Sequence, residues 1–144
     1  MRPNLKAFLP VLGVLLLSAC GGDSTGVSGD ATGTYTINSI NGNSIPYSVT
    51  LDPTYTITFT GGNFMISSGG AFSETISYTE LISGTTTNTT STCPGTYTQN
   101  GGSFTFTEAP SPDPNCGATY TGTWNGSDTF TMAFDVGFQA VYKK

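Results

Sequence analysis

The sequence predicts an all-β protein, arranged as an antiparallel up-and-down barrel of about eight or nine strands after a cleaved signal peptide. Apolar residues alternate with polar ones from Gly33 onward, which is the period of strands with one buried face. Asn-Gly and Gly-Gly turn signals separate the alternating segments. No segment beyond the N-terminus keeps a helical period, and the many threonines disfavour helices. A β-sandwich with the same meander is the alternative.

The first residues form an export signal. Arg2 and Lys6 give a basic start, and Ala7–Leu17 is almost wholly apolar but too short to cross a bilayer comfortably. This segment ends in Leu17-Ser18-Ala19-Cys20, which resembles the lipobox of bacterial lipoproteins. The resemblance implies that residues 1–19 are removed and that Cys20 carries acyl chains such as palmitate, which anchor the protein in the cell envelope at the outer membrane. An ordinary secretory signal with an incidental cysteine is the alternative.

Removal of the signal leaves a short tether and one strongly acidic domain. Residues 20–32 are rich in Gly, Ser, Thr and Asp and predict a flexible tether, and residues 33–144 form the predicted barrel domain. Nine acidic residues are opposed only by Lys143 and Lys144 in this mature chain, so its side-chain charge is about −7. It has no histidine and no arginine. These facts argue against nucleic-acid binding, cationic phosphate sites and histidine-based catalytic triads.

The alternating segments predict the strands in chain order. Ile45–Leu51 and Tyr55–Phe59 carry apolar residues at odd positions, whereas Phe64 and Ile66 are even. A β-bulge or sharp bend at Gly61-Gly62 accounts for this change of parity. Further strands are predicted at Phe72–Ile82, Thr87–Gln99, Ser103–Glu108, Cys116–Trp124, Thr129–Phe134 and Phe138–Tyr142. The turns between strands are predicted at Asn41-Gly42-Asn43, Gly69-Gly70, Asn100-Gly101-Gly102 and Asn125-Gly126-Ser127.

Two cysteines remain once Cys20 is assigned to the lipid. Cys93 and Cys116 form an even pair in an exported protein, which favours a structural disulfide over two free thiols. No C-x-x-C spacing or neighbouring cation indicates a redox role. The loop Ala109–Asn115 contains three prolines and cannot be a central strand, so we expect the disulfide to fasten it across one end of the sheet.

Over the whole domain the chain resembles small bacterial lipocalin-like lipoproteins. The resemblance runs from Gly33-Thr34-Tyr35 at the first strand to Ala140-Val141-Tyr142-Lys143 at the last. Lipocalins proper open with Gly-x-Trp, and here Tyr35 stands where the tryptophan would be. They also close with a basic residue packed over that tryptophan, for which Lys143 is the expected counterpart.

Candidate catalytic and metal-binding residues are few. Glu74 and Glu80 share strand parity with apolar residues and are expected to point into the barrel, but they lie about 20 Å apart along one strand at roughly 3.3 Å per residue. That separation is too large for an acid/base pair at one bond, so we do not expect an enzyme. Asp113 and Asn115 suggest calcium only weakly, because no EF-hand spacing follows and a solvated loop explains them. No cofactor or metal is expected.

Aromatic residues on the alternating faces are the best indication of a ligand site. Such residues either fill a small barrel or line a cavity for one small molecule. The sequence therefore predicts a non-catalytic barrel that binds a small, largely apolar, neutral or cationic molecule, because no cation is available for an anion. The alternative is an envelope or surface protein with a filled barrel and no ligand. The candidate lining residues are Tyr35, Tyr47, Ile57, Phe59, Tyr78, Tyr97, Phe106, Tyr120, Trp124 and Phe134.

Overall fold

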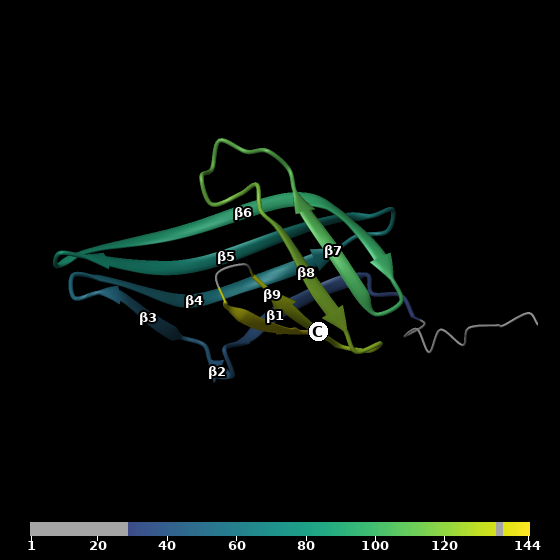
Figure 1. The fold of residues 1–144 in the computed structure, drawn as a ribbon, viewed down its shortest axis with the longest axis horizontal. Helices are drawn as coiled ribbons and strands as arrows, with labels where there is room; N and C mark the ends of the chain where they lie inside the picture. The colour runs from purple at the N-terminus through teal and green to yellow at the C-terminus, as the bar shows by residue number, and fades with distance from the viewer. Residues whose placement is uncertain (1–28, 135–136) are drawn as a thin grey trace, which may run out of the picture.

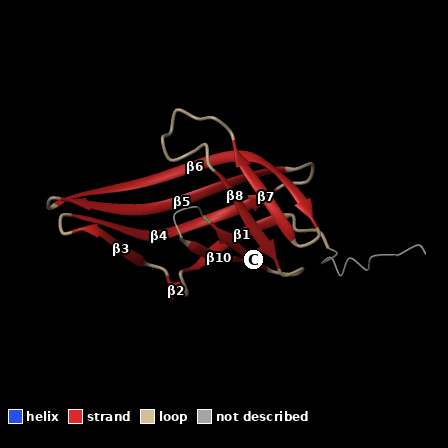
Figure 2. Cartoon of the chain, in the orientation of Figure 1, coloured by secondary structure: helices blue, strands red, loops and turns tan. Residues whose placement is uncertain are grey.

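The structure is a computed structural model that describes residues 29–134 and 137–144. The predicted signal peptide, Cys20 and most of the predicted tether lie outside the described residues. Every regular element within the described ranges is a β-strand (Figure 2). The strands are β1 (Gly33–Ile40), β2 (Asn43–Ser44), β3 (Tyr47–Asp52), β4 (Tyr55–Ile66), β5 (Ala71–Ile82), β6 (Thr85–Asn100), β7 (Ser103–Glu108), β8 (Thr119–Trp124), β9 (Thr129–Ala133) and β10 (Gln139–Lys143).

Eight of these strands close an antiparallel barrel, which confirms the predicted fold class. Strands β4 to β9 each pair with the next strand along the chain, so that this series ends at β10. Strand β1 closes the ring, because it pairs with β10 on one side and with the second half of β4 on the other. Strands β2 and β3 are additional and pair with β1 and with the first half of β4. The closed barrel is the architecture that the lipocalin resemblance implied.

Three long strands carry the sheet beyond the barrel on one side (Figure 1). Strands β4, β5 and β6 have 12, 12 and 16 residues, whereas β7–β10 have five or six each. The first half of β4, the second half of β5, the first half of β6 and β3 together form what we call the extension. The extension was not expected from the sequence as a separate feature. Apolar and polar residues alternate with the same period of two in a long strand and in a short one, so the pattern does not show where the barrel ends.

A bulge in β4 joins the extension to the barrel. The register between β4 and β5 shifts between Phe59 and Gly61, which confirms the predicted change of parity. Phe59 and Phe64 therefore both pack toward the core although their positions differ in parity. Gly62 is required here, because a Cβ atom at this position would lie 2.8 Å from the carbonyl oxygen of Thr75.

Cross-strand hydroxyl pairs cover the outer face of the extension and of the adjoining strands. Ser48 bonds Thr58 at 2.8 Å, and Ser77 bonds Thr90 at 3.0 Å. Thr50–Thr56, Thr75–Thr92 and Thr79–Asn88 repeat the pattern. Such pairs stabilise neighbouring strands by roughly 0.2–1 kcal/mol each, which gives the abundant threonines a role in the sheet.

The core is concentrated at one end of the barrel, which we call the closed end. The turns Ser67–Gly70, Gly101-Gly102 and Asn125–Asp128 and both described termini lie there. Aromatic rings fill it: Phe130 contacts the rings of Tyr35 and Phe104 with centroids 4.9 and 5.0 Å apart. Ala31, which belongs to the predicted tether, is also buried and accepts a 2.7 Å hydrogen bond from the Tyr35 hydroxyl. The packed domain therefore begins before Gly33.

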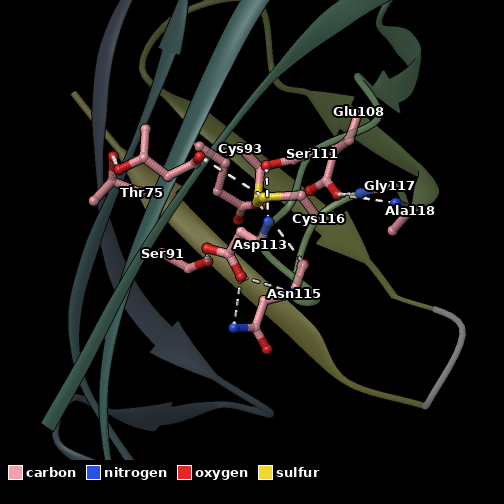
Figure 3. The surroundings of a disulfide bond; sticks show 12 residues. Thr75, Ser91, Cys93, Glu108, Ser111, Asp113, Asn115, Cys116, Gly117 and Ala118 are labelled. Carbon is pink, nitrogen blue, oxygen red and sulfur yellow. Dashed lines mark hydrogen bonds between the residues drawn. A yellow bond between two sulfur atoms is a disulfide. The ribbon is translucent and has the colours of Figure 1, made fainter.

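The opposite end, which we call the open end, is bordered by loops. The proline-rich loop occupies residues 109–118, and β8 begins at Thr119 rather than at the predicted Cys116. The reason is local: the backbone N–H groups of Gly117 and Ala118 donate to the Glu108 carboxylate and are not available to a sheet ladder. The disulfide between Cys93 and Cys116 is present, as predicted, and fastens this loop to β6 (Figure 3).

Candidate ligand-binding cavity

A cavity of about 270 Å³ lies inside the open end of the barrel. Strands β1, β4, β5, β6, β7, β8 and β10 contribute side chains to it, together with Phe134 and Phe138. Asn115 and Ala118 border it and are exposed, so the cavity opens to solvent beside the proline-rich loop. The lining residues are Ile37, Ile40, Phe59, Glu74, Ile76, Ser91, Cys93, Glu108, Asn115, Ala118, Tyr120, Phe134, Phe138 and Ala140.

Glu74 is one of two buried acidic residues that line the cavity, and it lies between two tyrosines. It is 7% exposed, and its carboxylate accepts hydrogen bonds of 2.9 Å from the Tyr120 hydroxyl and 2.5 Å from the Tyr142 hydroxyl. Burial raises the pKa of Glu74, and the two tyrosine hydrogen bonds only partly oppose this effect. Burial and the negative charge of Glu74 in turn raise the pKa of both tyrosines. Burial therefore disfavours the charged form of Glu74.

Glu108 is the second buried carboxylate and is bound on one side only. It is 6% exposed, and its Oε2 atom accepts hydrogen bonds of 2.7 and 2.9 Å from the backbone N–H groups of Gly117 and Ala118 (Figure 3). No hydrogen bond from the described residues reaches Oε1, and this atom is not fully enclosed, so it remains accessible from the cavity. Two charge-assisted hydrogen bonds thus hold the carboxylate in place while one oxygen stays free.

The proline-rich loop supplies the rim of the cavity and is held by hydrogen bonds as well as by the disulfide. The Ser91 hydroxyl donates to Asp113 Oδ2, and the backbone N–H of Asn115 donates to Asp113 Oδ1 at 2.9 Å. These donors lower the pKa of Asp113. Asp113 and Asn115 therefore organise the loop, and the described residues hold no cluster of three or more metal-binding side chains.

The predicted lining residues fall into three groups. Phe59, Tyr120 and Phe134 border the cavity, and the rings of Tyr120 and Phe134 are 5.0 Å apart. Tyr47, Ile57 and Tyr78 lie on the extension, paired around Phe59 and its neighbours. The remaining four belong to the packing of the closed end and do not border the cavity: Tyr35, Tyr97, Phe106 and Trp124.

The two glutamates considered as a catalytic pair are in different environments. Glu74 is in the cavity, whereas Glu80 lies on the extension and accepts a 2.6 Å hydrogen bond from the Tyr55 hydroxyl. Glu108 lines the cavity but was not among the residues predicted from the sequence. Its parity offered a signal, because it continues the even-numbered series of Phe104 and Phe106 on β7.

The basic residue packed over the first strand is Lys144, not the expected Lys143. Lys144 Nζ lies 5.2 Å from the centroid of the Tyr35 ring. Lys143 is exposed and is the β10 residue that pairs with Thr36 and Thr129. The register explains the difference, since Tyr142 faces the core and its neighbour Lys143 must face outward.

Comparisons with known proteins assign no family. No protein-family model matches the sequence, and no curated protein matches it significantly. Among residues 29–134 and 137–144, no helical segment has the length and hydropathy of a membrane span. The structure defines an eight-stranded antiparallel barrel with a largely apolar cavity that contains two carboxylates.

Proposed function

We propose that this chain is a lipid-anchored protein of the bacterial envelope whose barrel binds a small, largely apolar molecule, neutral or cationic, without transforming it. The observation that carries this proposal is the cavity. Most of its lining side chains are apolar, and the charged ones are two carboxylates. A concave apolar site with a few convergent polar groups is the usual form of a small-molecule site.

The positions of the lysines support the exclusion of anions. In the part of the chain that the structure describes, Lys143 and Lys144 are the basic side chains, and both lie at the closed end. A carboxylate entering the cavity would leave water without a counter-ion and would meet Glu74 and Glu108. Such a transfer costs several kcal/mol unless the ligand is protonated.

The path of the chain is compatible with an anchor at the closed end. Gly29 lies against the ring of Trp124, and it follows the predicted acylated Cys20 by nine residues. Nine extended residues span at most about 30 Å. An anchor at Cys20 would hold the closed end toward the membrane and leave the cavity accessible from the aqueous side.

The ligand-binding part is tested by native mass spectrometry of protein purified from its own host. We expect a retained small molecule of unchanged mass after incubation. We also expect competition by the methyl ester of a short fatty acid, of roughly ten non-hydrogen atoms to match a cavity of about 270 Å³, but not by the corresponding fatty acid at neutral pH. Ala140→Leu, which places a larger side chain at the cavity wall, should abolish retention. The same substitution at the exposed Ala133 of β9 is the control and should leave retention unchanged. Equal occupancy in both variants, or saturable binding of the fatty acid alone, would contradict the proposal.

The anchor is tested separately with Cys20→Ser. Cells fed a fatty acid with a detectable tag should label the native protein and not the variant, and the variant should move from the membrane to the soluble fraction. Labelling that survives the substitution would overturn lipidation at Cys20 and leave the cavity proposal untouched.

A further inference from the structure

We propose that the cavity selects an organic ammonium ion, whose N–H donates to the free Oε1 atom of Glu108 while its apolar body lies against Ile76 and the phenylalanine rings. This inference rests on the proposed function and narrows its ligand to a cation. It begins with the imbalance of charge: two carboxylates border one cavity, and the described lysines are at the other end of the barrel.

The two glutamates differ in how many of their carboxylate oxygens accept hydrogen bonds from the protein. Both oxygens of Glu74 are engaged by the hydroxyls of Tyr120 and Tyr142. Glu108 uses one oxygen for two backbone donors and leaves the other without a partner, although the side chain is more than nine-tenths buried. This Oε1 atom is not one of the fully enclosed polar atoms of the described residues, so it can be reached from the cavity. A ligand N–H can therefore donate to Glu108 without displacing a protein hydrogen bond, and a hydrogen bond to a charged acceptor is a strong one.

A neutral apolar ligand would not balance the negative charge of the cavity. It would displace water from the free oxygen of Glu108 without donating a hydrogen bond to it, which carries a desolvation penalty. An ammonium group supplies both a donor and the opposite charge, and the attraction is strengthened because the surroundings are apolar. Glu74 borders the same cavity, and wherever it is ionised its negative charge acts in the same direction.

The size and shape of the cavity limit the rest of the ligand. A volume of about 270 Å³ corresponds to about nine water molecules at roughly 30 Å³ each, so a ligand of roughly ten non-hydrogen atoms fits. The rings of Phe59 and Phe138 lie with centroids 6.2 Å apart, and the Phe134 ring stands beside Tyr120. These rings provide an apolar and aromatic wall for a ring or a branched alkyl group and are also suited to a cation.

A metal ion is a poorer match for the same charges. Calcium takes six to eight oxygen ligands, whereas Glu74 is occupied by two hydroxyls and Glu108 offers one free oxygen. The described residues also contain no cluster of three metal-binding side chains. The apolar wall would be of no use to an ion but is suited to an amine with a carbon body.

The test is calorimetric titration of the full mature chain with three probes that share one ring: 2-phenylethylammonium, 2-phenylethanol and phenylacetate. We expect the cation to bind at least about tenfold more tightly than the alcohol, which corresponds to about 1.4 kcal/mol, and the anion not to bind. Glu108→Gln should remove the advantage of the cation and leave alcohol binding within about twofold. Glu80→Gln on the extension is the matched control and should change neither.

The outcomes separate this inference from the proposed function. Equal affinity for the cation and the alcohol would overturn the selection of ammonium and leave the proposed function standing. Failure of all three probes to saturate would overturn both for ligands of this size. The comparison of probes on the native chain needs no variant, so it decides the question even if Glu108→Gln does not fold. A cation preference that persists undiminished in a folded Glu108→Gln protein would exclude Glu108 as the partner.

Discussion

The two ends of this barrel differ in the residues that form them. At the closed end, the rings of Phe64, Phe104, Phe106 and Phe130 are fully or almost fully buried and contact one another. At the open end, a disulfide, an aspartate-centred loop and two glutamates surround a cavity. Aromatic packing is therefore concentrated at the closed end, and the proposed ligand site lies at the open end, where the rings do not fill the barrel. The lengths of the strands make this division possible.

The long strands β4, β5 and β6 form a wall that continues past the open end, whereas β7–β10 stop at its rim. A barrel interior is filled by residues from all sides. Where the short strands end, the inward residues of the long strands have no opposing strand residues. The cavity lies at this transition, and the extension carries the aromatic residues Tyr47, Tyr55 and Tyr78 beyond it.

The largest expected effect is the loss of a ring at the closed end. Phe130 has no exposed surface, and Phe130→Ala should lower the free energy of unfolding by about 3–5 kcal/mol, because it removes buried area and leaves a void. Phe138→Ala at the cavity should lower it much less, by about 1 kcal/mol or under, since Phe138 is only partly buried. Urea denaturation measures both. Equal losses of unfolding free energy in the two variants would show that the two ends form one continuous core and do not differ in their packing.

The second effect sharpens the comparison at the open end. The disulfide has a sequence separation of 23 residues, and a loop of that size is stabilised by about 3 kcal/mol in the chain-entropy description. Replacing Cys93 and Cys116 together by serine should therefore lower the free energy of unfolding by about that amount. Ligand binding should weaken as well, because Cys93, Asn115 and Ala118 border the cavity. A double variant as stable as the parent would mean that the Asp113 hydrogen bonds alone hold the loop.

Much of the fold could be predicted because it is encoded locally. The two-residue period marked the strands, the asparagine and glycine pairs marked the turns, and the change of parity at Gly61-Gly62 located the bulge found at Phe59–Gly61. The pairing of Cys93 with Cys116 was predicted from the expected export signal and an even cysteine count, and the disulfide is present. Each of these signals lies within a few residues or follows from composition.

The site was less predictable because it is assembled across the barrel. Glu74, Tyr120 and Tyr142 come from three strands, and only closure of the barrel brings them together. The free oxygen of Glu108 depends on which N–H groups the loop at Gly117 presents. Periodicity could indicate that a side chain points inward, but it could not distinguish the filled end from the cavity, since Phe106 and Phe134 follow the same alternation.

The third effect is the pH dependence of the free energy of unfolding, to which Glu74 at the open end contributes. Burial raises the pKa of Glu74 above its ordinary value of 4.5, so the folded state holds this proton more tightly than the unfolded state. Stability from this group is therefore present below the ordinary value and is lost as pH rises through the folded value. The expected slope is about 1.4 kcal/mol for each pH unit of that window. Glu74→Gln should remove this slope, whereas Glu80→Gln should retain it.

This experiment is read by urea denaturation above pH 4.5. At lower pH the opposite sign takes over, because hydrogen bonds lower the pKa of Asp30, Asp52, Asp113 and Asp128, and their contribution is lost as pH falls. If the parent grew more stable than Glu74→Gln as pH rose through the window, Glu74 would be a stabilising charge rather than a buried one. The open end would then owe stability to its carboxylates.

The smallest expected effect concerns Lys144, which among residues 29–134 and 137–144 is the cation found over an aromatic ring. Lys144 Nζ lies 5.2 Å from the Tyr35 ring centroid, and its carbon stem covers Gly33. An exposed cation–π contact of this kind is worth about 0.5–1 kcal/mol. Lys144→Gln should lower the free energy of unfolding by no more than that. Lys144→Met, which keeps an apolar stem without the charge, should show how much of this loss is due to the charge, and Lys143→Gln should have no measurable effect.

The backbone N–H of Lys144 keeps its 2.8 Å hydrogen bond to the Asp128 carbonyl in every variant, so the pairing of the chain end is unchanged. A loss at Lys144 as large as that of Phe130→Ala would show that charge, and not aromatic packing, holds the closed end together.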